Sequence, residues 1–317
     1  MRNRSKAIAA AAMALMLALG AGCSINTKDN QTSGVNVQDN VQTAADNNSS
    51  AETEAQKNAD APKDESSEGT SETKSDNEAS VTLNGSSVSL SQGAQGIAVD
   101  GCVVTISAAG SYTVSGTLDD GQIIVNAPKT DKVDIYLDNV TMTCSSSAPI
   151  RVEQADRVTL HLADGSVNTF ADTAANTVSA CISSKEDLTI KGKGTLKVTG
   201  SAKHAIKSSN DLKIKNGILE LSAVSAGLYG EDSVQLTGGT ITVTACKDGI
   251  KSSNKEKTDK GWVSSEDAVV DIQNASGNGI EAVTGVTVLS GSIKIHSLKQ
   301  AINCTTQSIT EGCVVKY

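Results

Sequence analysis

The sequence predicts an all-β protein: a right-handed, single-stranded parallel β-helix that follows a disordered N-terminal tether. One pattern of aliphatic residues, polar corners and glycines recurs between residues 179 and 299. The apolar runs last three to five residues and alternate with polar ones, whereas an amphipathic helix needs i, i+3, i+4 spacing over a longer segment. Val, Ile and Thr dominate these runs, which favours strands.

The first aliphatic residue of each unit sets the period of the repeat. Successive positions are 24, 22, 22, 30 and 22 residues apart, and they are Ile182, Ile206, Leu228, Ile250, Ile280 and Ile302. One such unit cannot bury its own apolar face, but stacked units form a continuous core. The sequence therefore predicts that Ile206, Leu228 and Ile250 lie directly above one another.

Two further strands complete each unit. In the first unit they begin at Leu188 and Leu196, and each places alternate side chains on one face. Glycines lie between the second and third strands of most units, where a tight bend needs a permissive backbone; they are Gly194, Gly217, Gly239 and Gly291.

The β-helix is expected to span residues 81–317, because the chain becomes rich in strand-forming runs at Val81. The early coils are less regular, and residues 163–178, which hold Phe170, are expected to form an excursion from the coil. The first hairpin-like stretch and residues 309–317 are the expected caps.

Residues 1–23 have the features of an export signal. A basic start precedes an apolar run of 13 residues from Ala7 to Leu19, which is too short to span a bilayer. The run ends in Leu19-Gly20-Ala21-Gly22-Cys23, which resembles the lipobox of bacterial lipoproteins, although the leucine stands one place early. This resemblance implies lipidation of Cys23 and anchoring outside the cell; an ordinary secretory signal is the alternative.

Residues 24–80 are expected to be a disordered acidic linker. They contain no Trp, Tyr, Phe, Leu or Met, and they carry 12 acidic and 4 basic residues. Such a segment cannot bury enough apolar surface to offset its chain entropy. The linker therefore holds most of the net charge of −9, and the folded domain has no basic excess that would suit nucleic acid.

Six cysteines follow Cys23: Cys102, Cys144, Cys181, Cys246, Cys304 and Cys313. None of their spacings matches a zinc site. Free thiols in the core are the expected state, and Cys304 with Cys313 is the one candidate disulfide.

Acidic corners that precede the second strand are the candidate metal ligands. Equivalent corners of stacked coils lie about 4.8 Å apart, and Ca²⁺ takes six to eight oxygens from carboxylates, amides and carbonyls. The candidate ligands at these corners are Glu186, Asp187, Asn210, Asp211, Glu231 and Asp232. Asp248, which precedes the first aliphatic residue of its unit, is a further candidate. The alternative is that they are ordinary turn residues, with Lys185, Lys207 and Lys215 as countercharges.

Four residues are candidates for ligand binding. Lys207 and Lys251 each follow the first aliphatic residue of a unit, and Tyr229 occupies the same place in the unit between them. An insertion in the next unit, Lys255 to Lys260, precedes Trp262, and such loops often carry function. Trp262 either stacks on sugar or covers the edge of the core.

The ordered motifs resemble a family of clostridial secreted carbohydrate-binding β-helix proteins. They are Gly110-Ser111-Tyr112-Thr113-Val114-Ser115-Gly116, Asp187-Leu188-Thr189-Ile190, Asp211-Leu212-Lys213-Ile214, Gly238-Gly239-Thr240-Ile241-Thr242-Val243, Asp248-Gly249-Ile250-Lys251-Ser252 and Asn278-Gly279-Ile280. The resemblance implies a pectate-lyase-like solenoid that binds calcium, cellulose and acidic sugars. The motif Asp-Gly-Ile is altered in Ala226-Gly227-Leu228, which puts some metal sites in doubt.

These observations favour a monomeric cell-surface lipoprotein that binds acidic polysaccharide with the help of calcium and without catalysis. One alternative is a lyase acting on uronic-acid polymers, with Lys207 or Lys251 as the base that removes a proton. The other is a structural or adhesive surface protein with no sugar ligand, since the fold alone does not settle function.

Overall fold

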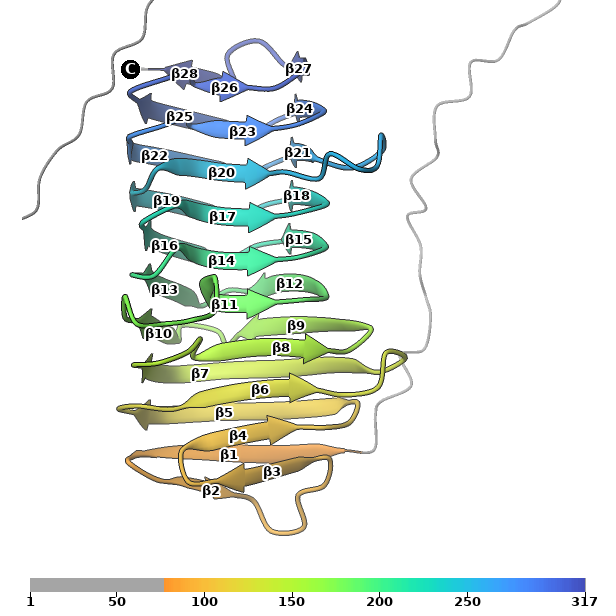
Figure 1. Ribbon diagram of the computed structural model, residues 1–317, viewed down its shortest axis with the longest axis vertical. Helices are drawn as coiled ribbons and strands as arrows, with labels where there is room; N and C mark the ends of the chain where they lie inside the picture. The colour runs from red at the N-terminus through yellow and green to blue at the C-terminus, as the bar shows by residue number, and fades with distance from the viewer. Residues whose placement is uncertain (1–76, 317) are drawn as a thin grey trace, which may run out of the picture. The chain divides into compact units, whose positions relative to one another are not determined.

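The computed structural model describes residues 77–316, and this part of the chain is a stack of coils built from β-strands (Figure 1). Strands of successive coils pair in parallel from β4 to β28. Within residues 77–316 no helix is long and apolar enough to cross a membrane. The predicted all-β, parallel arrangement is confirmed.

One strand of each coil joins a ten-stranded sheet, which faces the viewer in Figure 1. Its strands, in order along the stack, are β3 (Ile97–Asp100), β4 (Val103–Ile106), β6 (Gln122–Asn126), β8 (Ile150–Gln154), β11 (Ala180–Ser184), β14 (His204–Ser208), β17 (Ala226–Gly230), β20 (Asp248–Ser252), β23 (Ile280–Ala282) and β26 (Ile302–Asn303).

The other strands form two parallel rows within an 18-stranded sheet. The row that follows the ten-stranded sheet contains β9 (Arg157–Leu162), β12 (Asp187–Gly192), β15 (Asp211–Ile214), β18 (Ser233–Leu236), β21 (Trp262–Ser265), β24 (Gly285–Val288) and β27 (Thr306–Ile309). The next row contains β10 (Val167–Asp172), β13 (Thr195–Gly200), β16 (Ile218–Ala223), β19 (Thr240–Ala245), β22 (Val269–Ala275), β25 (Ser292–Ser297) and β28 (Val314–Lys316).

The predicted stacking of aliphatic residues is confirmed. Ile206 is the register partner of Leu228, and Leu228 is the partner of Ile250. The column continues through Ile182 below and Ile280 above, and all of these side chains are fully buried. Equivalent columns run through the other two rows, so the coils share one core.

The early coils differ because long strands replace the pairs of short ones. β7 (Lys132–Cys144) pairs with β9 through its first half and with β10 through its second half. β5 (Gly110–Leu118) and β1 (Glu78–Gly85) stack beneath it in parallel. This explains why the early apolar runs looked irregular against a three-strand template.

The expected excursion at residues 163–178 is wrong, because β10 is a regular strand of the stack. Phe170 is fully buried and pairs in register with Met142 and Val198. The pattern was obscured by Asn168, a buried polar residue at an inward position. Its amide accepts a hydrogen bond from the Val140 N–H and donates to Ser166 Oγ, so burial leaves it satisfied.

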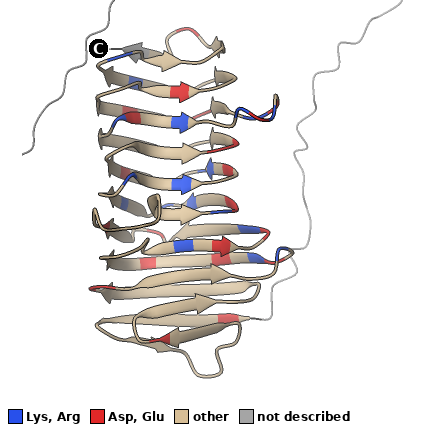
Figure 2. Cartoon of the chain, viewed as in Figure 1, with Lys and Arg blue, Asp and Glu red and all other residues tan. Residues whose placement is uncertain are grey.

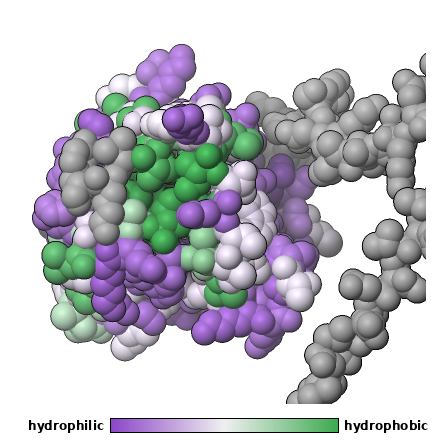
Figure 3. Space-filling model, turned by 90° about the horizontal axis from the view of Figure 1, so that it is seen from above, coloured by the Kyte–Doolittle hydropathy of each residue, from purple (hydrophilic) through white to green (hydrophobic). Residues whose placement is uncertain are grey.

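The two ends of the described domain differ. At the first end β1 pairs antiparallel with β2 (Val88–Leu90), and β3 pairs antiparallel with β4, so the expected hairpin-like cap is present. β1 begins at Glu78, three residues before the expected start at Val81. At the other end residues 306–316 form the strands of a last regular coil, and apolar side chains gather at its centre (Figure 3).

All six cysteines of the described domain are free. Cys144, Cys181, Cys246 and Cys313 are buried, and burial raises the pKa of the Cys246 thiol to about 12. Cys304 Sγ lies 3.0 Å from the carbonyl oxygen of Thr306. The candidate bridge between Cys304 and Cys313 is not formed. Cys23 lies outside the described residues.

Candidate functional site

A column of side chains runs along the outer face of the ten-stranded sheet, one from each coil. We call it the outward column, and its members, paired in register from β8 to β26, are Arg151, Ser183, Lys207, Tyr229, Lys251, Glu281 and Asn303. Each follows an inward aliphatic residue, so the alternation of the strand directs it outward. Neighbouring members lie one strand spacing apart, about 4.8 Å.

The structure places Lys207, Tyr229 and Lys251 on three successive coils of this column. Lys207 Nζ lies 5.5 Å from the centroid of the Tyr229 ring, within the range of a cation–π contact. A second contact of that ring is the imidazole of His204, stacked at 4.6 Å between centroids. The Tyr229 hydroxyl lies 2.5 Å from Ser253 Oγ, so Tyr229 is held both by the coil below it and by the coil above it.

His204 is buried beneath this column and is neutral. Burial, assisted by the charges of Lys203, Lys207 and Lys251, lowers the pKa of His204 to about 3. Its Nδ1 accepts a hydrogen bond from the Ala226 N–H at 3.2 Å, so the ring proton is on Nε2. A protonated His204 would lose this bond.

The pKa values of Lys207 and Lys251 are shifted in opposite directions. Burial, with the nearby charge of Lys203, lowers the pKa of Lys207, although Glu231 opposes this effect. Burial also acts to lower the pKa of Lys251, but the Glu281 carboxylate, with Nζ and Oε1 2.6 Å apart, outweighs it and the net shift is upward. Lys251 is thus the more firmly cationic of the two.

Carboxylates partly balance the column at its two ends. Arg151 and Lys185 both pair with Glu153, the second with Nζ and Oε2 2.5 Å apart. Lys251 pairs with Glu281, whereas Lys207 has no ion-pair partner within residues 77–316. Figure 2 shows these charges on β8, β14, β20 and β23, on the face toward the viewer. Lys207 is therefore the lysine of this column whose charge no ion pair balances within residues 77–316.

The turns that lead from the ten-stranded sheet into the row from β9 to β27 differ from the prediction. We call them the acidic corner, and its residues are Glu186, Asp187, Asn210, Asp211, Glu231 and Asp232. Asp187 and Asp211 are stacked, and Asp187 Oδ1 accepts a hydrogen bond from the Asp211 N–H. The next register partner of Asp211 is Ser233, not Asp232. Asp232 follows Asn210 instead, with its N–H donating to the Asn210 carbonyl, and Glu231 lies one residue further from the strand. The alignment of Glu231-Asp232 with Glu186-Asp187 was wrong by one residue.

A lysine from the insertion partly balances the charge of this corner. Lys260 Nζ lies 3.7 Å from Asp211 Oδ1 and 3.7 Å from Asp232 Oδ2. Asn254, at the start of the insertion, donates its amide to Asp232 Oδ1 at 2.5 Å. The insertion is held against the corner by the Gly261 N–H, which donates to the Asp232 carbonyl at 2.6 Å.

The predicted calcium ligands do not come together as one metal site. In the acidic corner an ammonium group takes the place between carboxylates that a cation would need. Asp248 lies at the opposite end of β20, fully buried, with Oδ2 3.6 Å from Lys251 Nζ. Within residues 77–316 no group of three or more His, Cys, Asp or Glu side chains is arranged to hold a metal ion. Calcium binding stays a prediction.

Trp262 is separate from the outward column. It begins β21 in the other sheet, as the register partner of Ser233 and Gly285. Its Nε1–H donates to the Asp259 carbonyl at 3.0 Å, which ties the indole to the insertion. The side chain is partly buried, and sugar stacking and coverage of the core edge both stay predictions.

Sequence reasoning missed Arg151, Glu281 and Lys260. The first two could have been found, because Arg151 follows Ile150 and Glu281 follows Ile280, as Lys207 follows Ile206. Lys260 lies in an insertion with no equivalent in the repeat, so no periodicity places it.

Comparison with known proteins defines the family. A sequence model of the family described as carbohydrate-binding domain-containing protein matches residues 100–314. The chain belongs to this carbohydrate-binding family. A carbohydrate-binding domain-containing protein of Acetivibrio thermocellus is 36% identical over 230 residues, which cover 70% of this chain and 80% of that protein. The match to the family includes the whole outward column and the acidic corner.

A solved structure supports the same assignment. The polysaccharide lyase-like protein from C. thermocellum, determined as a gadolinium derivative, superimposes with a TM-score of 0.73 and is 34% identical. The superposition covers 76% of this chain and 100% of that chain. This chain therefore shares the fold of that polysaccharide lyase-like protein, as the resemblance of its motifs implied.

Proposed function

We propose that this protein binds acidic polysaccharide along the outward column, without catalysis. The observation that carries the proposal is the stacking of Lys207, Tyr229 and Lys251 on consecutive coils of a carbohydrate-binding family member. A polymer lying along the coil axis meets one of these side chains at each coil. Lysine ammonium groups form charge-assisted hydrogen bonds with carboxylates, and a tyrosine ring offers an apolar face.

The charge distribution supports a uronic-acid polymer over a neutral one at this face. Lys207 is not paired with a carboxylate within residues 77–316, and a bound uronate would supply that partner. Lys251 is already paired with Glu281, so its contribution is smaller. Side-chain hydroxyl and amide groups of Ser183 and Asn303 extend the same column toward its ends.

The cellular setting belongs to the same proposal. Export and lipidation at Cys23 would place the domain outside the cell at the end of the acidic linker, as a monomer. Calcium has no assigned role in this mode of binding, because the Lys260 ammonium already lies beside two carboxylates of the acidic corner.

The test compares retention of the full chain on insoluble pectate with that of Lys207→Ala/Lys251→Ala. We expect the double variant to lose at least about tenfold in affinity, since each charge-assisted contact is worth roughly 1.5 kcal/mol or more. Lys197→Ala/Lys294→Ala removes the same charge from the outer faces of β13 and β25 and should bind normally. Equal loss in both variants would indicate nonspecific charge attraction.

Two further arms separate the remaining alternatives. Retention that falls on addition of EDTA would restore calcium to the mechanism. No retention by the unmodified protein on pectate or cellulose would favour a structural or adhesive role.

One observation favours a polysaccharide lyase as the second candidate. The lowered pKa of Lys207 makes this side chain a better general base than an ordinary lysine, and it lies beside Tyr229 on the same face. A lyase would convert polygalacturonate to unsaturated products, which absorb in the ultraviolet. Absorbance that rises with the protein, and not with Lys207→Ala, would replace the binding proposal by this one.

A further inference from the structure

We infer that Asn254 and Lys260 become joined by an amide bond between their side chains. Asn254 stands at the start of the insertion and Lys260 at its end. Both side chains meet the Asp232 carboxylate: Asn254 Nδ2 donates to Oδ1 at 2.5 Å, and Lys260 Nζ lies 3.7 Å from Oδ2. One carboxylate therefore contacts an amine and a carboxamide at once. The bond modifies the chain itself and is independent of the glycan that the protein binds.

The side-chain carbonyl of Asn254 is polarised toward attack. Its Oδ1 accepts hydrogen bonds from the backbone N–H groups of Glu256 at 2.9 Å and Lys257 at 3.2 Å. Two such donors stabilise the negative charge that forms on this oxygen when a nucleophile adds to the carbon. Backbone N–H groups only donate and an ionised carboxylate only accepts, so these partners also fix which way the Asn254 amide points.

The backbones of the two reacting residues are held in place. The Asn254 N–H donates to the Glu231 carbonyl at 2.8 Å. The Lys260 carbonyl accepts from Thr284 Oγ1, also at 2.8 Å. The ends of the insertion approach so closely that a Cβ added at Gly261 would lie 2.4 Å from the Asn254 backbone oxygen. Fixed ends reduce the entropy cost of bringing an amine to a carbonyl group.

Water has limited access to the reacting groups. The Asp232 side chain is 12% exposed, and that of Lys260 is 25% exposed. Low exposure strengthens the electrostatic interactions among these groups and reduces competition from water for the carbonyl carbon. The arrangement therefore favours attack by the amine over hydrolysis.

The reaction is a transfer of the Asn254 acyl group from one nitrogen to another. Lys260 Nζ forms a bond to Asn254 Cγ, the bond from Cγ to Nδ2 breaks, and the amide nitrogen leaves as ammonia. Asp232 takes a proton from the attacking amine and gives it to the departing nitrogen, so it ends unchanged. No atom is oxidised or reduced, and no further reactant is consumed.

The structure shows the side chains before this step. Lysine side chains are almost wholly protonated at neutral pH, and only the free amine attacks, so the reaction is slow. Freshly prepared protein is therefore the unreacted form, with the Lys260 ammonium intact.

The cross-link closes residues 254–260 into a ring at the edge of the stack. Ser253, whose Oγ lies 2.5 Å from the Tyr229 hydroxyl, directly precedes this ring. The closed ring therefore restrains the coil that holds Tyr229 from above.

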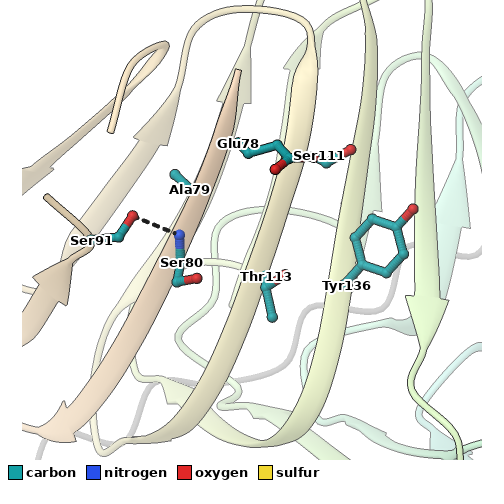
Figure 4. A pocket seen from close by; sticks show the side chains of 7 residues that line it. All are labelled: Glu78, Ala79, Ser80, Ser91, Ser111, Thr113 and Tyr136. Carbon is teal, nitrogen blue, oxygen red and sulfur yellow. Dashed lines mark hydrogen bonds between the residues drawn. The ribbon is translucent and has the colours of Figure 1, made fainter. Parts of the chain in front are cut away.

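This step needs no pocket for a second reactant, because both reactants belong to the chain. A depression of about 360 Å³ lies elsewhere in the described domain, on the outer faces of β1, β5 and β7 (Figure 4). Asn254, Asp232 and Lys260 are not among the residues that line it. The cross-link and that depression are therefore structurally separate.

The test follows the mass of the full chain as it ages at neutral pH. Aged protein should be lighter than fresh protein by one ammonia molecule, and complete trypsin digestion should give a branched peptide that contains both Asn254 and Lys260. Lys260→Arg keeps a positive charge beside the carboxylates but has no amine to attack, and Asp232→Asn lacks the base. Neither variant should lose ammonia at this site. Lys257→Arg, at an exposed lysine of the same insertion, is the matched control and should react normally.

Cleavage of the folded protein gives a second readout. Trypsin cuts after Lys255 or Lys257, which are exposed, should leave the aged unmodified chain as one band on a denaturing gel and Lys260→Arg as two fragments. Aged protein that yields separate, unmodified peptides for Asn254 and Lys260 would overturn the inference. Loss of ammonia from Asn254 without a branched peptide would also overturn it, since the asparagine would then have reacted alone.

Discussion

The ammonium group of Lys260 lies 3.7 Å from the Asp232 carboxylate, so the insertion carries its own cation to the acidic corner. Asp211 lies at the same distance from it, and Asp187 is stacked below Asp211. Burial, with the nearby charge of Asp211, raises the pKa of Asp187. One lysine thus keeps together three acidic side chains that would otherwise repel one another.

Removal of this cation should leave the acidic corner able to attract a divalent cation. We expect Lys260→Ala to lower the free energy of unfolding by about 1 kcal/mol, because the pairs are partly exposed. Added Ca²⁺ should then raise the melting temperature of the variant and not that of the unmodified protein, by binding the folded state. Lys255→Ala, an exposed lysine of the same insertion, is the control. Equal stabilisation of all three proteins by Ca²⁺ would show that the cation binds elsewhere.

Neutral His204 should make the fold sensitive to acid. The pKa of His204 is about 3 in the folded protein and about 6.5 when unfolded, so between these values the unfolded state binds the extra proton. The contribution of His204 to the free energy of unfolding is fully present above about pH 6.5. It falls by roughly 1.4 kcal/mol per pH unit as the pH decreases toward 3. Urea titrations across this range measure the slope.

His204→Asn is the matched variant for this test. Asn keeps an acceptor near the Ala226 N–H but does not titrate. The difference in slope between the two proteins isolates His204 from the carboxylates, which also titrate in acid. Parallel slopes would mean that folding does not lower the pKa of His204.

Glu281 should restrain acidic-sugar binding through its pair with Lys251. Glu281→Gln keeps the size of the side chain and removes the nearer of the two carboxylates that pair with Lys251, so we expect affinity for polygalacturonate to rise several-fold at low salt. Glu220→Gln is the control, since Glu220 pairs with Lys197 at 2.9 Å on the outer faces of β13 and β16. An unchanged or lower affinity in Glu281→Gln would show that Lys251 does not contact the ligand.

The glycine of Asp248-Gly249-Ile250 should matter for packing and not for a ligand. A Cβ added at Gly249 would lie 2.5 Å from Ile272 Cδ1 and 2.6 Å from the Gly279 carbonyl oxygen. Gly249→Ala should therefore cost roughly 1 to 3 kcal/mol in the free energy of unfolding, measured with urea. Ala205 occupies the same place two coils below, and Ala205→Gly should cost less. A fully stable Gly249→Ala would contradict this close packing.

Much of the fold could be predicted because each coil repeats the same inward positions. Ile206, Leu228 and Ile250 stack as their spacing indicated, and the same period places Lys207, Tyr229 and Lys251 together. Where polar residues face inward, as Asn168 does, the hydrophobic pattern fails although the strand is present. Asp232 was misplaced because it is adjacent to a second acidic residue, and only the register with Asn210 decides between them.

The candidate sites and some other side-chain contacts were less accessible to prediction. Lys260 reaches the acidic corner from an insertion, so its position depends on how that loop folds back. Tyr136 and His161 come together through the register of β7 with β9, in coils where long strands replace short ones. Contacts of this kind arise from tertiary register, which a single sequence does not reveal.

Each coil contributes one residue to the outward column at the same place, so the side chains on this face recur about every 4.8 Å. Duplication of a whole 22-residue unit, such as the one that separates Ile206 from Leu228, would add one side chain to the column and leave the other positions unchanged. The length of this surface, and with it the number of simultaneous contacts to an extended ligand, can therefore change through gain or loss of repeat units without redesign of any contact.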